Sequence, residues 1–290
     1  MDSFRVGTII KAISGFYYVV CDGKVHECKA RGKFKKLGIS PMVGDVVEFS
    51  QNTVTNVLPR RNHIIRPKVA NVEQMIIVIA TCAPNPDFYL IDQLIVMCLF
   101  LDVKPILCFN KADLSSTDEL RQIYKVFDCI DCCAEENDLG NLIEILQGKT
   151  SVFAGNSGVG KSTILQNLGL DTPKGDISKI NRGKHTTRVV ELFPLDNSIF
   201  AQPLHTDNPS FVIDTPGFSV LTLEHLKSDI LQANLADYFP EFQDFSCEFR
   251  GCLHDNPRCD IYRAVQDKII PQTRYNSYLK ILDSLEVTYD

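Results

Sequence analysis

The chain has 290 residues, of which 44% are hydrophobic, and a formal net charge of −6. This length allows two or three domains with a sizeable core, and the acidic balance excludes a uniformly basic surface. Any contact with RNA must therefore be a local basic patch. The longest apolar run, at residues 94–101, is too short to span a bilayer. We expect a buried helix there and no association with a membrane.

The cysteine content indicates the compartment. Eleven cysteines are an odd number, and eight of them are scattered through mostly apolar stretches, where a reduced cysteine behaves as a small hydrophobe. This scatter does not resemble a disulfide framework. The start of the chain also lacks the long apolar run of a signal peptide. We expect a cytoplasmic protein with free thiols.

Residues 1–62 predict an all-β domain. The runs 16–21 and 24–29 flank Asp22-Gly23, a two-residue hairpin signal, and strand-like runs follow at 46–50 and 53–58. Five short strands in so short a segment suggest a closed barrel such as an OB-fold. A basic stretch runs beside an aromatic residue in this domain: Lys29, Arg31, Lys33, Phe34, Lys35 and Lys36. It suits an RNA-binding surface, and a solvated loop is the alternative.

Residues 63–222 predict an α/β domain. Prolines and arginines at 59–67 mark a linker. Apolar runs typical of buried strands then alternate with helical stretches, at 75–80, 105–110, 127–132, 151–154, 189–195 and 211–214. This alternation predicts a mainly parallel sheet covered on both faces. Residues 223–290 predict a small helical domain, with helices at 226–239 and 262–285.

A phosphate-binding loop follows the run 151–154. The sequence GNSGVGKS at 155–162 has the form G-x-x-x-x-G-K-[ST] between a strand and a helix. Its backbone amides and the helix N-terminus suit phosphate oxygens; Lys161 should reach the β- and γ-phosphates, and the Ser162 hydroxyl should bind Mg²⁺. An accidental glycine-rich turn is the alternative. The loop residues expected at the nucleotide are Gly155, Asn156, Ser157, Gly158, Val159, Gly160, Lys161, Ser162 and Thr163.

The motif Asn110-Lys111-Ala112-Asp113 follows the run 105–110 and has the N-K-x-D form of GTPases. The Asp113 carboxylate can accept two hydrogen bonds from guanine, whereas adenine would leave it unpaired. Asn110 can bind the guanine edge or hold neighbouring loops, and the Lys111 stem can cover the base. In most GTPases the phosphate loop precedes this motif. The reverse order here predicts a circular permutation, which leaves the site unchanged in space.

A second acidic motif and a polar loop complete the predicted catalytic site. Asp214 ends the run 211–214 and can hold Mg²⁺ through water, and Gly217 can offer its N–H to the γ-phosphate. Residues 175–188 form a polar, basic loop, in which Thr186 or Thr187 could bind Mg²⁺ only with GTP present; we favour Thr187. His185 is the nearest polar candidate to orient the attacking water, although it could instead contact rRNA.

A Cys₃His cluster lies near the C-terminus. Cys247, Cys252, His254 and Cys259 fall within thirteen residues. Three thiolates and one imidazole are a typical tetrahedral ligand set for one structural Zn²⁺, and they leave no open position for catalysis. Chance clustering is the alternative. In so short a segment the metal would replace part of a hydrophobic core.

The order of these motifs, together with GNSGVGKST, RGKHTTR, DTPGF and CEFRGCLH, resembles the ribosome small-subunit-dependent GTPase A family over nearly the whole chain. The resemblance implies a Mg²⁺-dependent GTPase with an N-terminal OB-fold and a C-terminal zinc domain. It implies that the enzyme acts late in small-subunit maturation, contacts the rRNA and is stimulated by that subunit. It also places Cys133 and Ala134 at the base, where the family has a Ser-Ala loop, and it points to His185 for catalysis.

Two other functions remain open from the sequence. The chain could be a nucleotide-gated RNA-binding scaffold with negligible hydrolysis, because Phe218 stands where many GTPases have a water-orienting glutamine. An ATP-dependent kinase could use the same phosphate loop, but Asp113 favours guanine. We expect a monomer that binds GTP, GDP and the small ribosomal subunit.

Overall fold

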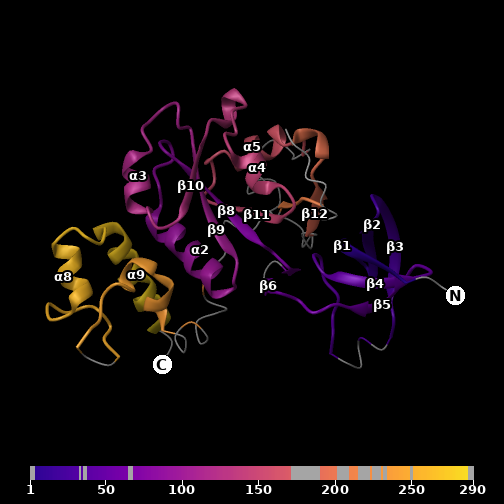
Figure 1. Cartoon of the computed structure of the whole chain (residues 1–290), viewed down its shortest axis with the longest axis horizontal. Coiled ribbons are helices and arrows are strands. Elements are labelled where there is room, and N and C mark those ends of the chain that lie inside the picture. The colour runs from indigo at the N-terminus through magenta and orange to yellow at the C-terminus, as the bar shows by residue number, and fades with distance from the viewer. Residues whose placement is uncertain are drawn as a thin grey trace, which may run out of the picture.

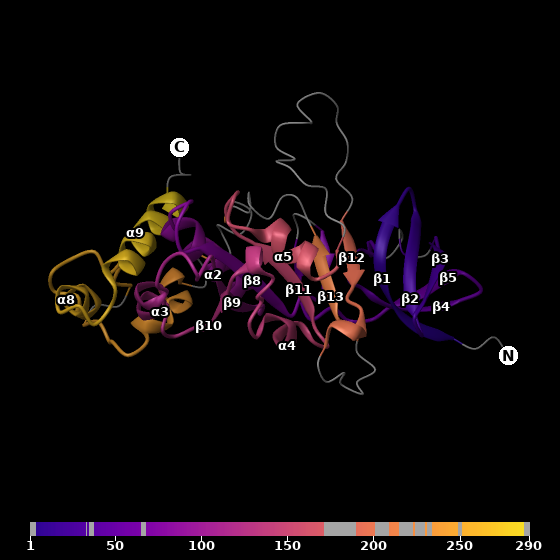
Figure 2. The same ribbon diagram turned by 90° about the horizontal axis from the view of Figure 1, so that it is seen from above.

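The computed structural model describes residues 4–32, 34, 38–64, 68–170, 190–200, 209–214, 223, 230, 234–248 and 251–286. These residues form three units in a row: an N-terminal barrel, a central sheet with its helices, and a C-terminal helical unit (Figures 1 and 2). The central unit, which carries the two nucleotide motifs, therefore contacts both of the others.

The N-terminal unit is a closed five-stranded barrel, as predicted. It consists of β1 (Arg5–Ile13), β2 (Phe16–Cys21), β3 (Lys24–Ala30), β4 (Val46–Ser50) and β5 (Thr53–Val57). β1 pairs with both β2 and β4, and β3 pairs with β5, which closes the barrel. Asp22 (φ 50°) and Gly23 (φ 68°) form the predicted tight turn between β2 and β3, since both have the positive φ of a type I′ hairpin.

The interior of the barrel corrects one prediction. Phe34, which the sequence offered as an aromatic group for RNA, is only 3% exposed and packs with Ile9, Val47 and Phe49. Burial of this ring stabilises the barrel and removes it from any stacking role. Of the basic residues around it, the structure describes Lys29, whose Nζ lies 4.9 Å from the centre of the Phe16 ring, and Arg31, which is exposed.

The segment predicted as a linker is structured on both sides of its gap. Arg60 donates to the fully buried carboxylate of Asp45 through Nε at 2.6 Å and Nη2 at 2.8 Å. Two short strands, β6 (His63–Ile64) and β7 (Val69–Ala70), pair with each other. The buried Asn62 side chain bonds the backbone of Val72 in both directions. The barrel is therefore joined to the central unit by specific polar contacts.

The central sheet has the order β10-β9-β8-β11-β13-β12 and continues into the barrel through β1. Its strands are β8 (Gln74–Ala80), β9 (Lys104–Asn110), β10 (Asp128–Cys132), β11 (Thr150–Ala154), β12 (Glu191–Pro194) and β13 (Phe211–Asp214). The pairings are parallel except for those of β12. A salt bridge of 2.7 Å between Lys11 and Glu191 lies where β1 meets β12.

Helices cover both faces of this sheet. They are α2 (Phe88–Phe100), α3 (Asp118–Ile123), α4 (Leu142–Leu146) and α5 (Lys161–Asn167), with 3₁₀ turns at Ala134–Glu136 and Asn197–Ile199. Alternate residues of β8 belong to different cores: Ile77 packs with α2 residues, whereas Val78 packs with residues of α4 and α5. The run 94–101, predicted to be a buried helix, lies almost entirely in α2, which ends at Phe100. No helix of the described part of the chain is long and apolar enough to cross a membrane.

The C-terminal unit differs from its predicted helices. Within the run 226–239, Asn234 has φ 63° and is followed by a 3₁₀ turn, Leu235–Tyr238, so no single helix spans that run. The run 262–285 is two helices, α8 (Asp260–Gln266) and α9 (Gln272–Glu286). Lys268 (φ 59°) and Pro271 separate them, since neither conforms to a helix interior. A further 3₁₀ turn, Pro240–Phe242, completes the unit.

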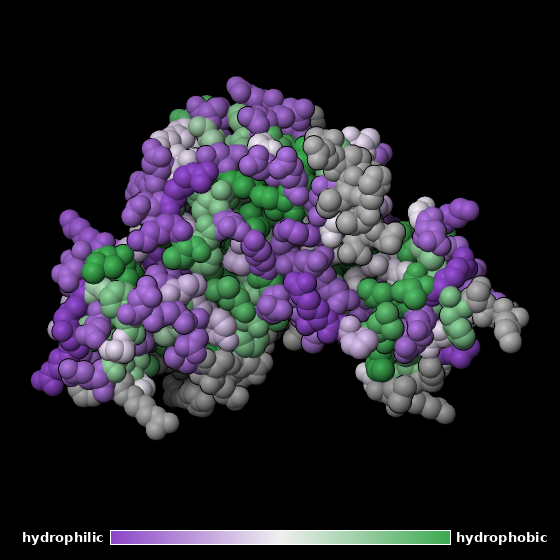
Figure 3. Space-filling model, viewed as in Figure 1, coloured by the Kyte–Doolittle hydropathy of each residue, from purple (hydrophilic) through white to green (hydrophobic). Residues whose placement is uncertain are grey.

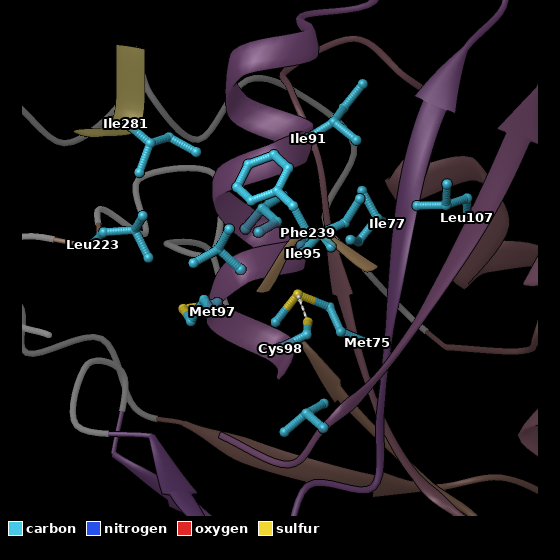
Figure 4. Packing of buried hydrophobic residues seen from close by; sticks show 14 of the residues in the cluster. Met75, Ile77, Ile91, Ile95, Met97, Cys98, Leu107, Leu223, Phe239 and Ile281 are labelled. Atoms are coloured by element: carbon cyan, nitrogen blue, oxygen red, sulfur yellow. Dashed lines mark hydrogen bonds between the residues drawn. The ribbon is translucent and has the colours of Figure 1, made fainter. Parts of the chain in front are cut away.

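Most of the apolar surface lies inside these units. α2 is packed between the sheet and the C-terminal unit, with Ile77 and Leu107 on one side and Phe239, Ile281 and Leu223 on the other (Figure 4). On the face seen in Figure 3, hydrophilic residues predominate, and apolar residues form separate smaller areas at the centre of the middle unit and on the barrel.

Candidate nucleotide site and metal centre

The phosphate loop connects β11 to α5 and needs glycine at two positions. Gly155 has φ +135°, and a Cβ there would lie 2.3 Å from the Val78 carbonyl oxygen. Gly160 has φ +100°, and its Cβ would lie 2.1 Å from Asn110 Nδ2. Any larger residue would strain the backbone and collide with a neighbouring strand. The loop is thus fitted against the strand ends that carry the other motif.

Lys161 is partly buried at the start of α5. Its Nζ donates to the carbonyl oxygens of Gly155 at 2.7 Å and Asn156 at 2.6 Å. None of the ion pairs between described residues includes it. Burial lowers the pKa of Lys161 to about 8. The ammonium group therefore has no anionic partner within the described ranges, and a bound polyphosphate would supply one.

Asn110, the last residue of β9, links two loops. It is 2% exposed, its Nδ2 donates to the Val159 carbonyl oxygen at 2.8 Å, and its Oδ1 accepts from the Ala134 amide at 3.0 Å. Both polar atoms are therefore used in holding the phosphate loop against the loop after β10. Of the two roles that the sequence left open, the contacts correspond to the holding of neighbouring loops.

Lys111 and Asp113 lie at the mouth of this arrangement. Lys111 Nζ donates to the carbonyl oxygens of Ala83 and, at 3.3 Å, Gly158. Asp113 is exposed, and its Oδ1 accepts from the Cys133 thiol at 2.9 Å. This hydrogen bond is the main reason that the pKa of Cys133 is raised. The carboxylate predicted to read guanine is thus directed toward the loop predicted to touch the base.

Two further residues of the site were missed in the sequence. Asn167 of α5 donates to the Ala134 carbonyl oxygen at 2.7 Å, and Thr81, directly after β8, donates through Oγ1 to the Lys111 carbonyl oxygen at 2.6 Å. A signal was available for Thr81. It is the first residue after a buried strand parallel to β9 and β11, so it had to fall at the edge where the motifs meet.

The magnesium ligands are described only in part. Ser162 and Thr163 lie in the first turn of α5. Asp214 ends β13, which runs parallel to β11, so its backbone lies at the same edge of the sheet as the phosphate loop. The side chain of Asp214 and the whole of Gly217, His185, Thr186 and Thr187 fall outside the described residues.

The four predicted zinc ligands come together. The ligand atoms of Cys247, Cys252, His254 and Cys259 all lie within 4.8 Å of one another. His254 Nδ1 is 3.3 Å from Cys247 Sγ and 3.4 Å from Cys259 Sγ. Burial, together with the neighbouring thiols, raises the pKa of Cys247 to about 12. Three converging sulfur atoms and one imidazole nitrogen fit a divalent thiophilic metal, which would stabilise the thiolate forms.

Aromatic residues hold the loop that carries these ligands. Tyr275 and Tyr278 of α9 donate through their hydroxyl groups to the carbonyl oxygens of His254 at 2.7 Å and Leu253 at 3.2 Å. The rings of Phe242 and Tyr278 lie 6.1 Å and 5.9 Å from the His254 ring. The Cys₃His cluster is therefore anchored on α9 rather than on a free loop.

The strand order and the two motif loops define a circularly permuted GTPase. Comparison with known proteins agrees. The family model of the RsgA GTPase matches residues 57–224, and that of the RsgA N-terminal domain matches residues 6–56. The chain belongs to the RsgA GTPase family.

Relatives and solved structures cover almost the entire chain. It is 40% identical over 298 residues to the small ribosomal subunit biogenesis GTPase RsgA 1 of Listeria monocytogenes, covering 97% of each protein. The RsgA of Mycoplasmopsis pulmonis is 37% identical over 289 residues, covering 97% of this chain and 100% of that protein. YjeQ from Thermotoga maritima superimposes with a TM-score of 0.76 at 30% identity, covering 99% and 100% of the two chains. YloQ, described as a circularly permuted GTPase, gives 0.75 at 32%, covering 99% and 97%.

Proposed function

We propose that this chain binds GTP with Mg²⁺, hydrolyses it to GDP and phosphate, and does so in the maturation of the small ribosomal subunit. The observation that carries the proposal is the partly buried Lys161 ammonium, whose partners among the described residues are two carbonyl oxygens in a glycine loop shaped for phosphate. The names of the relatives, which are small ribosomal subunit biogenesis GTPases, support the place of this activity in the cell.

The phosphate loop binds the nucleotide through its backbone amides. Residues 155–163 surround the β- and γ-phosphates, and Lys161 leaves its two loop carbonyls to pair with them. The lysine and the backbone dipoles stabilise charge that develops on the phosphoryl oxygens. The role of this part of the site is positioning and electrostatic stabilisation.

Guanine is selected at the opposite side of the site. Asp113 exchanges its hydrogen bond from Cys133 for two from guanine, and the Cys133–Ala134 backbone lies against the base. Lys111 covers the base with its stem, and Asn110 keeps both loops in place. A nucleotide without the two donors would leave the carboxylate unpaired, which supports discrimination against adenine.

The Ser162 hydroxyl, Asp214 through water and, with GTP bound, Thr187 would hold Mg²⁺. The bound ion would supply positive charge to neutralise the β- and γ-phosphate oxygens. Gly217 donates its N–H to the γ-phosphate, and His185 orients the attacking water. The common sheet edge of β11 and β13 supports the assignment of Asp214, and the other assignments rest on the sequence.

One structural zinc ion is bound by Cys247, Cys252, His254 and Cys259. The convergence of the four donor atoms supports this ligand set. We propose three domains, an RNA-binding barrel (residues 1–62), the GTPase (63–222) and the zinc domain (223–290). In the cytoplasm the protein acts as a monomer and contacts the rRNA of the small subunit with the first of these domains.

The experiment is GTP hydrolysis by the purified protein with and without purified small ribosomal subunits, with large subunits as the control. We expect stimulation by the small subunit of at least about tenfold, because partners commonly complete GTPase sites. Lys161→Met should abolish it. Nucleotide-dependent binding to the subunit without any stimulation would instead favour the scaffold function, and failure to bind GTP would refute both.

A further inference from the structure

Helix α2 connects the nucleotide site to the C-terminal unit. It is buried on opposite sides, against β8 and β9 through residues such as Ile95 and against Phe239 and Ile281 of the C-terminal unit (Figure 4). A helix packed on both sides behaves as a rigid element, because close-packed interiors transmit small displacements. A shift of the C-terminal unit must therefore either move α2 or open the core around it.

A buried ion cluster fixes this packing. Arg274 of α9 is 1% exposed, and its Nη1 donates to Asp92 of α2, whose side chain is fully buried. Its Nε and Nη2 donate to the two carboxylate oxygens of Glu241 at 2.5 and 3.1 Å. The guanidinium carbon lies 4.8 Å from the centre of the Phe239 ring. The arginine therefore has one anionic partner across the interface and one within its own unit.

The same helix holds the metal loop. Tyr275 follows Arg274 directly, and Tyr278 lies one turn later; both donate to carbonyl oxygens of that loop. When the metal loop is ordered, these two hydrogen bonds also hold in place the turn of α9 that carries Arg274. Without the metal, the loop would lose the bonds that hold His254 in place, and these two hydrogen bonds would weaken with it.

The other end of α2 reaches the nucleotide site. Asp87 caps the helix by accepting from the Leu90 amide at 3.1 Å. The preceding loop is bonded to Lys111 through Thr81 and Ala83. A hollow beside the phosphate loop is lined from both sides, by Pro84, Asp87 and Leu90 and by Gly155, Asn156 and Val159. A change in the position of α2 would therefore affect both the phosphate loop and the loop that carries Lys111.

We infer that Arg274 is a positioning residue that couples metal binding at the Cys₃His centre to guanine-nucleotide affinity. With the metal bound, α9 is ordered, Arg274 holds Asp92, and α2 keeps the loop at residues 81–87 in place for the nucleotide. Without it, the nucleotide must order these elements itself, which weakens binding. The inference rests on the proposed function, since it requires both the metal and the nucleotide site.

Such coupling is reciprocal. If the metal raises nucleotide affinity by a given factor, the nucleotide must raise metal affinity by the same factor. A residue that merely stabilises the fold would leave both factors unchanged when it is substituted. The two measurements are the dissociation constant of GDP for zinc-loaded and zinc-stripped protein, and the zinc affinity, from competition with a chelator, with and without GDP.

Two matched variants separate the interface from the interior of the unit. Asp92→Asn removes the charge that Arg274 holds across the interface and leaves the pair with Glu241. Glu241→Gln removes the other charge of the same arginine, inside the C-terminal unit. Both are close in shape to the native residues, and both should retain one zinc ion per chain, which verifies that the unit is folded.

In the wild type we expect zinc to tighten GDP binding by about fivefold or more, within the usual range of coupling between sites, with an equal effect of GDP on zinc. In Asp92→Asn the ratio of the GDP dissociation constants without and with zinc should fall toward one, and GDP binding should be weak in both the zinc-loaded and the zinc-stripped protein. Glu241→Gln should keep most of the wild-type ratio. A wild-type ratio of one, or an unchanged ratio in Asp92→Asn, overturns the inference and leaves the proposed function intact. Wild-type protein that binds neither GDP nor zinc overturns both.

Discussion

Two desolvated cations, Lys161 in the phosphate loop and Arg274 in α9, lie in opposite electrostatic surroundings. Among the residues that the structure describes, Lys161 bonds to two carbonyl oxygens of its own loop and to no carboxylate, and burial lowers its pKa to about 8. Arg274 is more deeply buried, but the charges of Asp92 and Glu241 outweigh burial and raise its pKa. The lysine has no anionic partner in the described part of the chain, whereas the arginine has two.

This difference in partners distinguishes a ligand-binding residue from a residue that holds two structural units together. Burial of a charge is costly unless it is paired, so an unpaired lysine is retained only where a ligand completes it. A fully paired arginine has no capacity for a ligand and instead holds together the elements that supply its partners. The substitutions below should therefore have opposite effects on stability and on binding at the two positions.

The largest effect is expected for Arg274→Met. It leaves the buried carboxylates of Asp92 and Glu241 without a cation, which costs about 3–5 kcal/mol for a buried pair. Hydrogen exchange of the α9 amides should accelerate by about two to three orders of magnitude, while β11 amides in the same protein serve as the internal control. Unchanged protection of α9 would show that the arginine does not hold the interface.

Lys161→Met should weaken binding and spare the fold. Charged hydrogen bonds contribute roughly 1.5–3 kcal/mol each, so loss of those to the β- and γ-phosphates should weaken GDP and GTP binding by about a hundredfold or more. Stability of the free protein should be unchanged or higher, because an uncompensated charge is removed. Isothermal calorimetry and urea unfolding give the two quantities. A destabilised variant would mean that Lys161 is a structural cation.

A pH effect should follow from the lowered pKa of Lys161. In the free protein the lysine loses its proton above about pH 8, whereas bound phosphates raise its pKa and retain the proton. Nucleotide affinity is therefore fully present below pH 8 and falls as pH rises through it. Between pH 7 and 8.8 GDP affinity should drop by about sevenfold, as for one titrating group. The GDP affinity of Lys161→Met should not change over the same pH range. A wild-type affinity that is equally independent of pH would contradict the assignment of this titration to Lys161.

The smallest effect is expected for Lys280→Met. This exposed cation on α9 lies 4.6 Å from the centre of the Tyr89 ring of α2, so it crosses the same interface as Arg274 but in water. Exposed contacts of this kind contribute about 0.5–1 kcal/mol at most. Exchange of the α9 amides should rise by less than about fivefold. A change as large as that of Arg274→Met would mean that burial does not distinguish the two cations.

The sequence predicted the elements whose signals are local. The strands β8, β9, β11 and β13 are short apolar runs, as expected for a parallel sheet with both faces buried, and the last three end in or just before a motif. The hairpin at Asp22-Gly23 was equally visible, because positive φ requires such residues. The Cys₃His cluster was found from spacing alone, since its four ligands lie within thirteen residues.

The predictions that failed did so for one of two reasons. Either the cause is a contact between distant residues, or a helix-breaking residue was overlooked. Phe34 is buried because the barrel closes over it, which no local pattern reveals. Arg274 and Asp92 are 182 positions apart, so their pairing depends on the docking of two units. The helix predicted at 262–285 should have been divided, since Pro271 ends a helical pattern. Asn110 was left with two roles because its hydrogen-bond partners come from two loops that are distant in the sequence.

The most direct measurement is a comparison of GTP, XTP and ATP binding by the wild type and by Asp113→Asn. We expect the wild type to prefer GTP over ATP by at least about a hundredfold, because adenine would leave the carboxylate unpaired. Asp113→Asn exchanges an acceptor for a donor and should invert the preference toward XTP, whereas Cys133→Ser should keep the preference for GTP. Equal affinity of the wild type for GTP and ATP, or a GTP preference retained in Asp113→Asn, would contradict a guanine-specific site at this position.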